Sequence, residues 1–356
     1  MIANGRPRVA VAGGGPGGCA AALALAEAGI DVIVFERGAP GKDKACGDAF
    51  LPDAVARLAG LGVESASFAE SGGRRFSTID LWGDGGAVWA ISLGAAEGWI
   101  APRAAIDQAL RNRVVRRAAL RYETTVTRVA RARRGRWLLT TRSAAGDAAI
   151  EVDGVVLATG ASNGLAKHWG IEGEPLRGAS ISAYAGEACL DAPRFEFLAD
   201  ELPGYGWRFP LADGRMNAGY CAVMSPASGL RAATERYLRR SGANAHGPLR
   251  GGSGPMWSGR GTCWHHDAGL TSCGDAAGLV DPVTGEGISA ALESGTAAGR
   301  ALAEFLIGGS DTTPLARYSA WLGATFLERY RPTAVRRVWA NLCRSPGNEA
   351  GGATSR

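Results

Sequence analysis

The sequence predicts an α/β protein in which a helix-flanked parallel sheet is interleaved with an antiparallel sheet and followed by C-terminal helices. Three observations predict this class. A strand, a glycine-rich turn, a helix and a second strand follow one another between Val9 and Glu36. Strand-like stretches with many aromatic residues and few long apolar runs fill residues 175–265. Two segments with strong helical periodicity follow, Gly287–Ile307 and Leu315–Trp339.

The first element is a strand that runs into the turn Gly13–Gly18 and then into a helix. Gly13 permits a tight turn, Gly15 lets a pyrophosphate approach the backbone, and Gly18 lets the helix pack against the strand. The N–H groups at the helix start favour phosphate. Glu36 ends the second strand, where its carboxylate can accept hydrogen bonds from both ribose hydroxyls of an adenosine. The unit therefore predicts a site for FAD or NAD rather than NADP, against the alternative of a plain βαβ turn.

The remaining elements follow the same pattern rules. A glycine- and charge-rich segment precedes a short helix, a β-hairpin and a longer helix, and alternating segments then lead to a buried strand and a short returning strand. The short helix is expected at Pro52–Leu58, the hairpin at Arg75–Leu81 with Ala87–Leu93, and the longer helix at Ala104–Arg117. The alternating segments are Arg121–Arg131 and Arg136–Thr141, the buried strand is Gly154–Gly160, and the returning strand is Leu270–Cys273.

Composition narrows the class of protein. The 356 residues are 46% hydrophobic and 21% charged, as in ordinary globular proteins. The net charge of +5 is spread along the chain and does not indicate nucleic-acid binding, and the basic residues of 111–136 are expected to form a solvated face. No apolar run approaches the ~18 residues of a membrane span, and no signal peptide precedes Arg6. Seven cysteines without a CxxC pair indicate a reducing compartment, so a cytoplasmic protein is expected.

Several separated motifs resemble one superfamily. Gly13–Gly18 with Glu36, Ala158–Gly160, Gly274–Ala277, Pro282 and Gly285–Gly287 resemble FAD-dependent oxidoreductases of the para-hydroxybenzoate hydroxylase fold. Lys44-Ala-Cys46-Gly47-Asp48 and Pro203–Pro210 resemble the KxCG and YxWxFP motifs of geranylgeranyl reductase-like flavoproteins, which are related to flavin-dependent monooxygenases and halogenases. The motifs occur in the same order as in the family, and the resemblance covers about residues 8–307.

The resemblance implies FAD as cofactor and a division of the chain into two interleaved lobes. A Rossmann-type FAD-binding lobe is expected over residues 1–75, 100–170 and 268–310. An antiparallel-sheet substrate lobe is expected over residues 76–99 and 171–267. Residues 311–344 are expected to form a C-terminal helix, and the Gly- and Ser-rich residues 345–356 a disordered tail.

Around the flavin, Asp275 could accept a hydrogen bond from a ribityl hydroxyl, could cap the next helix, or could do both. The N–H groups and dipole of Gly285–Gly287 would face the N1–C2=O edge of the flavin, and Pro282 would shape the wall over the isoalloxazine. Arg103 would contact phosphate or ribityl oxygens, or would be a surface arginine. The predicted cofactor-binding residues are Gly13, Gly15, Gly17, Gly18, Glu36, Arg37, Cys46, Gly47, Arg103, Gly160, Asp275, Pro282, Gly285, Gly287 and Ile288.

Three alternating aromatic residues, Tyr205, Trp207 and Phe209, should point to one face of a strand. We expect them to form a substrate-binding wall that faces the flavin, the alternative being an ordinary sheet core. Gly204 and Gly206 favour the wall, because glycine among large aromatics lets another group approach closely.

Cys46, Lys44 and Trp207 are the candidate catalytic residues. The resemblance places Cys46 near flavin and substrate, where a thiol beside Lys44 could be a proton donor or a gate. Cys46 could equally be a small buried residue. His265 and His266 are adjacent and would face opposite sides of a strand, and no carboxylate or cysteine completes a ligand set, so no metal site is predicted.

The sequence contains no second GxGxxG motif, so no dedicated NAD(P)H domain is expected. Electrons would come from NAD(P)H that docks transiently or from an external flavin reductase. We expect a monooxygenase that hydroxylates an aromatic or unsaturated substrate through a flavin hydroperoxide, slightly ahead of geranylgeranyl reductase-like reduction of a carbon–carbon double bond by hydride from FADH2. Halogenation is less favoured, because Tyr205–Pro210 does not reproduce a GWxWxIP-type stretch. The substrate could be a small molecule or a side chain on a partner protein; no nucleic acid and no integral membrane segment are expected.

Overall fold

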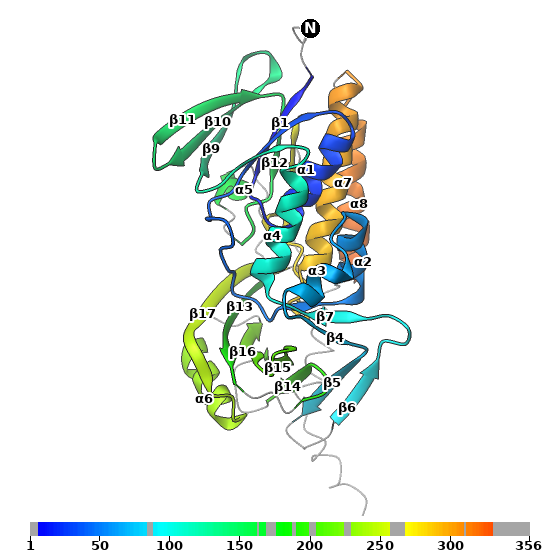
Figure 1. Cartoon of the computed structure of the whole chain (residues 1–356). Coiled ribbons are helices and arrows are strands. Elements are labelled where there is room, and N and C mark those ends of the chain that lie inside the picture. The colour runs from blue at the N-terminus through cyan, green and yellow to red at the C-terminus, as the bar shows by residue number, and fades with distance from the viewer. Residues whose placement is uncertain are drawn as a thin grey trace, which may run out of the picture.

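A computed structural model describes residues 6–83, 88–161, 164–168, 176–186, 190–198, 204–223, 229–256, 268–309 and 311–329. Figure 1 shows two lobes, one with a parallel sheet and long helices and the other with a large, mostly antiparallel sheet. The mixed α/β class predicted from the sequence is confirmed.

The first lobe is built on a five-stranded parallel sheet of order β18-β12-β1-β2-β8. In that order the strands are Leu270–Ser272, Gly154–Leu157, Arg8–Ala12, Asp31–Phe35 and Ala119–Arg121. Val9–Ala12 is almost completely buried between the neighbouring strands, and the helix that follows packs against the central strands. Helix α1 (Pro16–Glu27) connects β1 to β2. The loops that follow β1, β2, β12 and β18 therefore meet at the carboxyl edge of the sheet, where ligands of such sheets bind.

Two small antiparallel sheets complete this part of the chain. One has the order β11-β10-β9 and the other β3-β7-β4. Their strands are Thr125–Arg131 (β9), Trp137–Ser143 (β10), Gly146–Val152 (β11), Ala49–Phe50 (β3), Arg74–Phe76 (β4) and Gly98–Ile100 (β7). The shorter helices are Pro52–Gly60 (α2), Ser65–Glu70 (α3), Arg103–Val114 (α4), Gly164–His168 (α5) and the 3₁₀ turn Arg133–Gly135.

Two predicted strands are each divided between two sheets. The segment predicted as Arg75–Leu81 gives β4 to a small sheet and Thr78–Gly83 (β5) to the large one. The segment predicted as Arg121–Arg131 gives its first residue to β8 and Thr125–Arg131 to β9. A strand-like pattern does not show which sheet a strand joins, so the change of sheet is visible only in the structure.

The second lobe is a seven-stranded sheet of order β17-β13-β16-β15-β14-β5-β6, antiparallel except for the pair β14–β5. Its other strands are Ala245–Met256 (β17), Leu176–Ala185 (β13), Met216–Val223 (β16), Gly204–Pro210 (β15), Arg194–Phe197 (β14) and Val88–Ser92 (β6). The expected hairpin is present as β5 and β6. Helix α6 (Leu230–Arg240) covers one face of this sheet, which the strand-only prediction for residues 175–265 missed.

Two long helices, α7 (Ile288–Ile307) and α8 (Thr313–Arg329), pack against each other and against the first lobe (Figure 1). Helix α7 crosses α1 at glycine contacts: a Cβ on Gly295 would lie 2.2 Å from the carbonyl oxygen of Gly17. The part of the predicted helix beyond residue 329 and the expected tail lie outside the described residues. None of the described helices combines the length and the apolar character that a membrane span requires.

Candidate flavin and substrate site

The glycines of the turn after β1 differ in what an added side chain would meet. Some are enclosed by other atoms of the protein, whereas one has open space beside it. A Cβ on Gly13 would lie 2.1 Å from the carbonyl oxygen of Ala158, and one on Gly18 would lie 1.9 Å from that of Gly13. A Cβ on Gly15 would meet no atom within 4 Å. Helix α1 has no side-chain cap, so its first N–H groups are available to an anion. This open, uncapped helix start fits the pyrophosphate of FAD.

The predicted ribose acceptor, Glu36, is held against this turn. Its Oε2 accepts a hydrogen bond from the N–H of Gly14 (2.8 Å) and its Oε1 from that of Gly38 (2.7 Å). Each carboxylate oxygen has a further lone pair and can still accept from a ribose hydroxyl. Arg37 beside it is exposed.

Arg111 departs from the solvated face expected for the basic residues of 111–136. Most of these residues are exposed, but Arg111 is buried and its Nε donates to the carbonyl oxygen of Gly14 at 2.8 Å. Helix α4 presents this one arginine to the glycine turn, where it fixes the position of Gly14. The expectation is therefore wrong at Arg111, because composition does not show which side of a helix faces the protein.

Asp275 lies in the 3₁₀ turn Gly274–Ala277 that follows β18. Its Oδ2 is 3.4 Å from the Nζ of Lys44, and a Cβ on Gly287 would lie 3.3 Å from its Oδ1. Asp275 and Gly287, two of the predicted flavin-binding residues, therefore meet Lys44 at one place. The alternative that Asp275 caps the next helix is wrong, because the capping positions belong to Cys273 and Gly287.

The loop before α7 is organised by two carboxylates. Asp281 accepts from the N–H groups of Val283 (2.7 Å) and Thr284 (3.0 Å), and Glu286 accepts from that of Ser289 (2.7 Å). Burial raises the pKa of Glu286, and the Ser289 hydrogen bond opposes this. Glu286 thus accepts a hydrogen bond from one N–H at the start of α7. That the other N–H groups face a flavin stays a prediction.

The other predicted cofactor residues at the carboxyl edge of the parallel sheet differ in their local surroundings. Gly160 and Gly285 have positive φ values of 64° and 68°, which favour glycine. Pro282 and Ile288 are buried beside them. Gly17 lies against α7, since its Cβ would meet the carbonyl oxygen of Ala291 at 3.1 Å.

Arg103, the first residue of α4, is only 4% exposed, so the surface alternative is wrong. Its Nε and Nη2 each lie 3.1 Å from a carboxylate oxygen of Asp107, and its Nη1 lies 3.4 Å from the Sγ of Cys46. Burial alone would lower the pKa of Arg103, but Asp107 and Cys46 outweigh this and raise it. The cation that contacts Cys46 is therefore Arg103, whereas the predicted neighbour Lys44 pairs with Asp275.

Asp48 is completely buried, with a positive φ of 64°, and accepts hydrogen bonds from three sides. Its Oδ1 accepts from the N–H of Arg103 (3.2 Å), and its Oδ2 accepts from the hydroxyl of Tyr184 (2.7 Å) and from Nδ2 of Asn217 (2.8 Å). Burial raises the pKa of Asp48, and these hydrogen bonds oppose the rise. Its own N–H lies 3.4 Å from the Sγ of Cys46.

Sequence reasoning missed the roles of Asp48, Tyr184 and Asn217. Asp48 follows the KxCG motif directly, which is a usable signal. Tyr184 and Asn217 lie on β13 and β16 and carry no motif, so only the fold brings them to Asp48.

The three predicted aromatic residues line one face of β15. Neighbouring ring centroids, Tyr205 to Trp207 and Trp207 to Phe209, are each 6.3 Å apart. This face belongs to the main core that continues into the first lobe, and Trp207 is only 3% exposed. The Nε1 of Trp207 donates to Oδ1 of Asn217 (3.0 Å), and a Cβ on Gly47 would lie 2.9 Å from the ring of Phe209.

The two glycines of β15 do not open space beside this aromatic face. A Cβ on Gly206 would lie 2.3 Å from the ring of Tyr237 on α6, and one on Gly204 would lie 1.8 Å from the carbonyl oxygen of Cys221. These glycines admit α6 and the neighbouring strand. The expectation that Gly204 and Gly206 favour a substrate-binding wall is therefore wrong. The wall itself stays a prediction.

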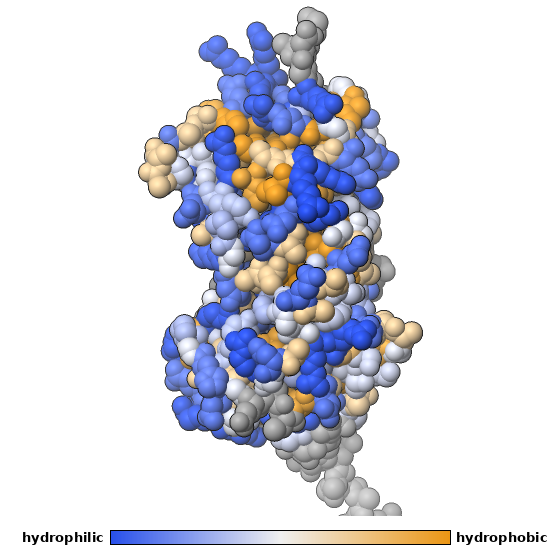
Figure 2. Space-filling view, viewed as in Figure 1, coloured by the Kyte–Doolittle hydropathy of each residue, from blue (hydrophilic) through white to orange (hydrophobic). Residues whose placement is uncertain are grey.

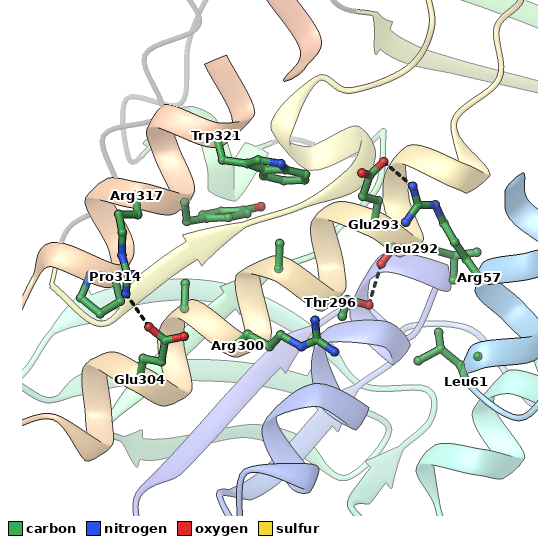
Figure 3. Close-up of a pocket in the computed structure, with 14 residues that line it drawn as sticks. Arg57, Leu61, Leu292, Glu293, Thr296, Arg300, Glu304, Pro314, Arg317 and Trp321 are labelled. Atoms are coloured by element: carbon green, nitrogen blue, oxygen red, sulfur yellow. Dashed lines mark hydrogen bonds and ion pairs between the residues drawn. The ribbon is translucent and has the colours of Figure 1, made fainter. Parts of the chain in front are cut away.

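A separate open cavity of about 570 Å³ lies between α2, α7 and α8 (Figure 3). Arg57 pairs with Glu293 (2.9 Å) and Arg317 with Glu304 (2.6 Å) at its two ends. None of its lining residues belongs to the predicted site. Among the described residues, no group of three or more histidine, cysteine or acidic side chains could hold a metal; His265 and His266 lie outside them.

The uncapped glycine turn, Glu36 at the end of β2 and the two-lobed α/β fold define an FAD-dependent oxidoreductase. The sequence pattern of the pyridine nucleotide-disulphide oxidoreductase family matches residues 7–194. The menaquinone reductase of Mycolicibacterium smegmatis is 32% identical over 350 residues, which cover 87% of this chain and 78% of the relative. The chain belongs to this FAD-binding family. A digeranylgeranylglycerophospholipid reductase of Methanopyrus kandleri is also similar, at 27% identity over 91% of this chain and 84% of the relative.

Solved structures show the same fold. A geranylgeranyl bacteriochlorophyll reductase-like protein of Thermoplasma acidophilum superposes with a TM-score of 0.83 at 19% identity, over 96% of this chain and 89% of its own. The flavin-dependent brominase Bmp2 superposes with a TM-score of 0.77 at 18% identity, over 94% and 88%. The fold is thus shared by a reductase-like protein and by a flavin-dependent brominase.

Proposed function

We propose that the protein uses FAD to reduce a carbon–carbon double bond in the prenyl chain of a lipid such as a prenylated quinone. Double-bond reduction is the second of the two reactions that the sequence predicted; the sequence slightly favoured a monooxygenase. The relative at 32% identity is a menaquinone reductase, which supports the reductase. The solved structures, at 18–19% identity, share the fold with either chemistry and do not favour one.

The observation that carries the proposal is the thiol of Cys46, which lies 3.4 Å from Nη1 of buried Arg103. Reduction of a double bond needs a hydride on one carbon and a proton on the other. A thiol can give that proton, and the guanidinium beside it can stabilise the thiolate that remains. Hydroxylation of an aromatic ring makes no such demand for a thiol acid.

When bound, reduced FAD supplies the hydride. The open helix start at Gly15 would hold its pyrophosphate and Glu36 its ribose, while Asp275 would accept from the ribityl chain. Cys46 would transfer its proton to the second carbon of the double bond, and solvent would restore the thiol after product release.

The aromatic face of β15 would form the apolar wall for the prenyl chain. Its residues Tyr205, Trp207 and Phe209 are at most 6% exposed. This burial favours a free lipid molecule over a side chain presented by a partner protein. For the electron source we propose NAD(P)H that docks transiently or an external flavin reductase, since the sequence has no second GxGxxG motif.

The test is to reduce the holoprotein without oxygen and mix it with one of two quinones, one with an unsaturated and one with a fully saturated chain. We expect the unsaturated quinone alone to give a product with a reduced chain, measured by mass after the ring has been reoxidised. Equal flavin reoxidation by both quinones, with every chain unchanged, would show ring reduction and overturn the proposal.

A further inference from the structure

The KxCG loop is joined to the large sheet of the second lobe by side chains of Asp48 and Asn217. The Nδ2 of Asn217 donates to the carbonyl oxygen of Cys46 and to Oδ2 of Asp48, at 2.8 Å in both cases. Its Oδ1 accepts from Nε1 of Trp207 at 3.0 Å. One amide therefore contacts the backbone of the thiol residue and the ring of the central aromatic residue at the same time.

Asp48 fixes the orientation of that amide. An ionised carboxylate only accepts, so its neighbour must turn the NH2 group toward it and leave the amide oxygen for Trp207. The remaining acceptor positions are used by the N–H of Arg103 and the hydroxyl of Tyr184. The N–H of Arg103 lies at the start of α4, where the helix dipole favours a negative charge. The carboxylate is thereby satisfied although it is fully buried.

Tyr184 connects this buried group to the surface of the second lobe. Its side chain is half-buried, and its ring lies under two guanidinium groups, those of Arg215 at 5.3 Å and Arg250 at 4.5 Å. Its hydroxyl reaches inward to Asp48. The charged and titratable groups around Asp48 are therefore Arg103 on α4, Tyr184 on β13 with its two arginines, and Cys46 on its own loop.

We propose that Asp48 is a positioning residue, which acts through Asn217 and with Tyr184 to set the Cys46 thiol against the Trp207 wall. Its catalytic meaning rests on the proposed double-bond reduction, but the positioning can be measured without turnover. The backbone of Asp48 adds to the hold, because its N–H contacts the Cys46 sulfur while its carbonyl oxygen accepts from Ala101 (2.9 Å). Its left-handed φ persists because these contacts surround it.

The test compares Asp48→Asn and Tyr184→Phe with the matched control Asp80→Asn. Asp80 is a half-buried carboxylate of β5 in the second lobe, and it pairs with Arg194 at 3.2 Å rather than with any residue of the KxCG loop. The amide that Asp48→Asn introduces would place a donor against donors from Asn217 and Tyr184. We expect kcat to fall about 10²-fold in Asp48→Asn, as for a misplaced reacting group, with FAD content unchanged and a smaller fall in Tyr184→Phe.

The second readout is the alkylation rate of Cys46 by iodoacetamide in the FAD-loaded protein, followed by peptide mass mapping. We expect faster alkylation in Asp48→Asn and Tyr184→Phe, and the rate of the wild type in Asp80→Asn. In a double-mutant cycle, Tyr184→Phe should have no further effect once Asp48 is replaced.

The two proposals fail in different ways. Altered Cys46 alkylation with no double-bond reduction by any form would retain the positioning role and overturn the proposed reaction. Alkylation and kcat equal to those of Asp80→Asn would overturn the positioning role. Where Asp48→Asn does not fold, Tyr184→Phe decides by the same two readouts, because it removes only one hydroxyl.

Discussion

Individual glycines of the first turn have different physical reasons to be glycine. Gly13 and Gly18 are enclosed by backbone carbonyl groups, so any side chain there would force the strand and helix apart. Gly15 faces open space and has an ordinary φ of −78°. Within the described part of the chain, no protein atom lies within 4 Å of a Cβ at Gly15, so a bound molecule is what a side chain there would meet.

This difference gives a test of the phosphate site. Gly15→Ala should leave the free energy of unfolding within about 1 kcal/mol of the wild type, because alanine fits the backbone and the space. The bound pyrophosphate would meet the new methyl group, so FAD content, measured by absorbance after purification, should fall strongly. Gly18→Ala is the control that should not fold. Full FAD content in Gly15→Ala would remove this turn from the site.

Replacement of Cys46 tests the proton donor. Cys46→Ala should lower kcat by about 10² or more, the usual contribution of a positioned acid, with FAD content and KM little changed. Steady-state kinetics and flavin absorbance measure these quantities. Unchanged kinetics would leave Cys46 as a small packing residue, the alternative that the sequence left open.

The buried carboxylate of Asp48 should make activity sensitive to acid. Burial raises its pKa above the ordinary aspartate value, so Asp48 takes up a proton as pH falls through this raised pKa. The protonated group loses acceptor positions for Asn217 and Tyr184, so kcat should decline on the acid side. Asp48→Asn, which cannot titrate, should lack this decline in a kcat–pH profile. An identical profile in both forms would assign the decline to another group.

At the scale of elements, the crossing of α1 and α7 brings two backbones into contact. Gly295 and Gly299 on α7 face Gly17 and Ala21 on α1, and added Cβ atoms would lie 2.2 Å and 2.6 Å from carbonyl oxygens. The same crossing sets the start of α7 beside Asp275 and the glycine turn. Helix packing therefore positions two predicted parts of the flavin site relative to each other.

Overpacking this crossing should cost stability. Gly295→Ala should lower the free energy of unfolding by about 1–3 kcal/mol or more, because backbone atoms must separate. Gly60→Ala at the end of α2 is the matched control, since a Cβ there meets nothing within 4 Å and should be neutral or mildly stabilising. Denaturant unfolding measures both; equal midpoints would contradict the close contact.

For the whole molecule, the parts that the sequence predicted are those with local signals. The first βαβ unit, the hairpin of β5 and β6 and helix α7 follow from periodicity and turn residues. Helix α6 was missed although its buried residues recur at helical spacing, because it lies among strand-like segments. The changes of sheet at β4–β5 and β8–β9 were missed because they depend on pairing with distant strands.

The residues of the candidate site likewise divide into those with a local sequence signal and those without one. Cys46, Asp275 and the β15 aromatic residues carry motifs, whereas Tyr184 and Asn217 reach Asp48 only through pairing of distant strands. Figure 2 shows hydrophilic residues over much of both lobes, with the most extensive hydrophobic colour on the upper lobe. No surface pattern in this view marks the buried contacts among Asp48, Asn217 and Cys46, where we propose that the chemistry takes place.

The mass of the product distinguishes reduction of a double bond from its oxygenation. The reduced holoprotein would be given an unsaturated prenyl lipid, first without oxygen and then in air. We expect a product heavier by two hydrogen atoms under both conditions, strongly diminished by Cys46→Ala. A product heavier by one oxygen atom, formed only in air, would overturn the proposed reduction.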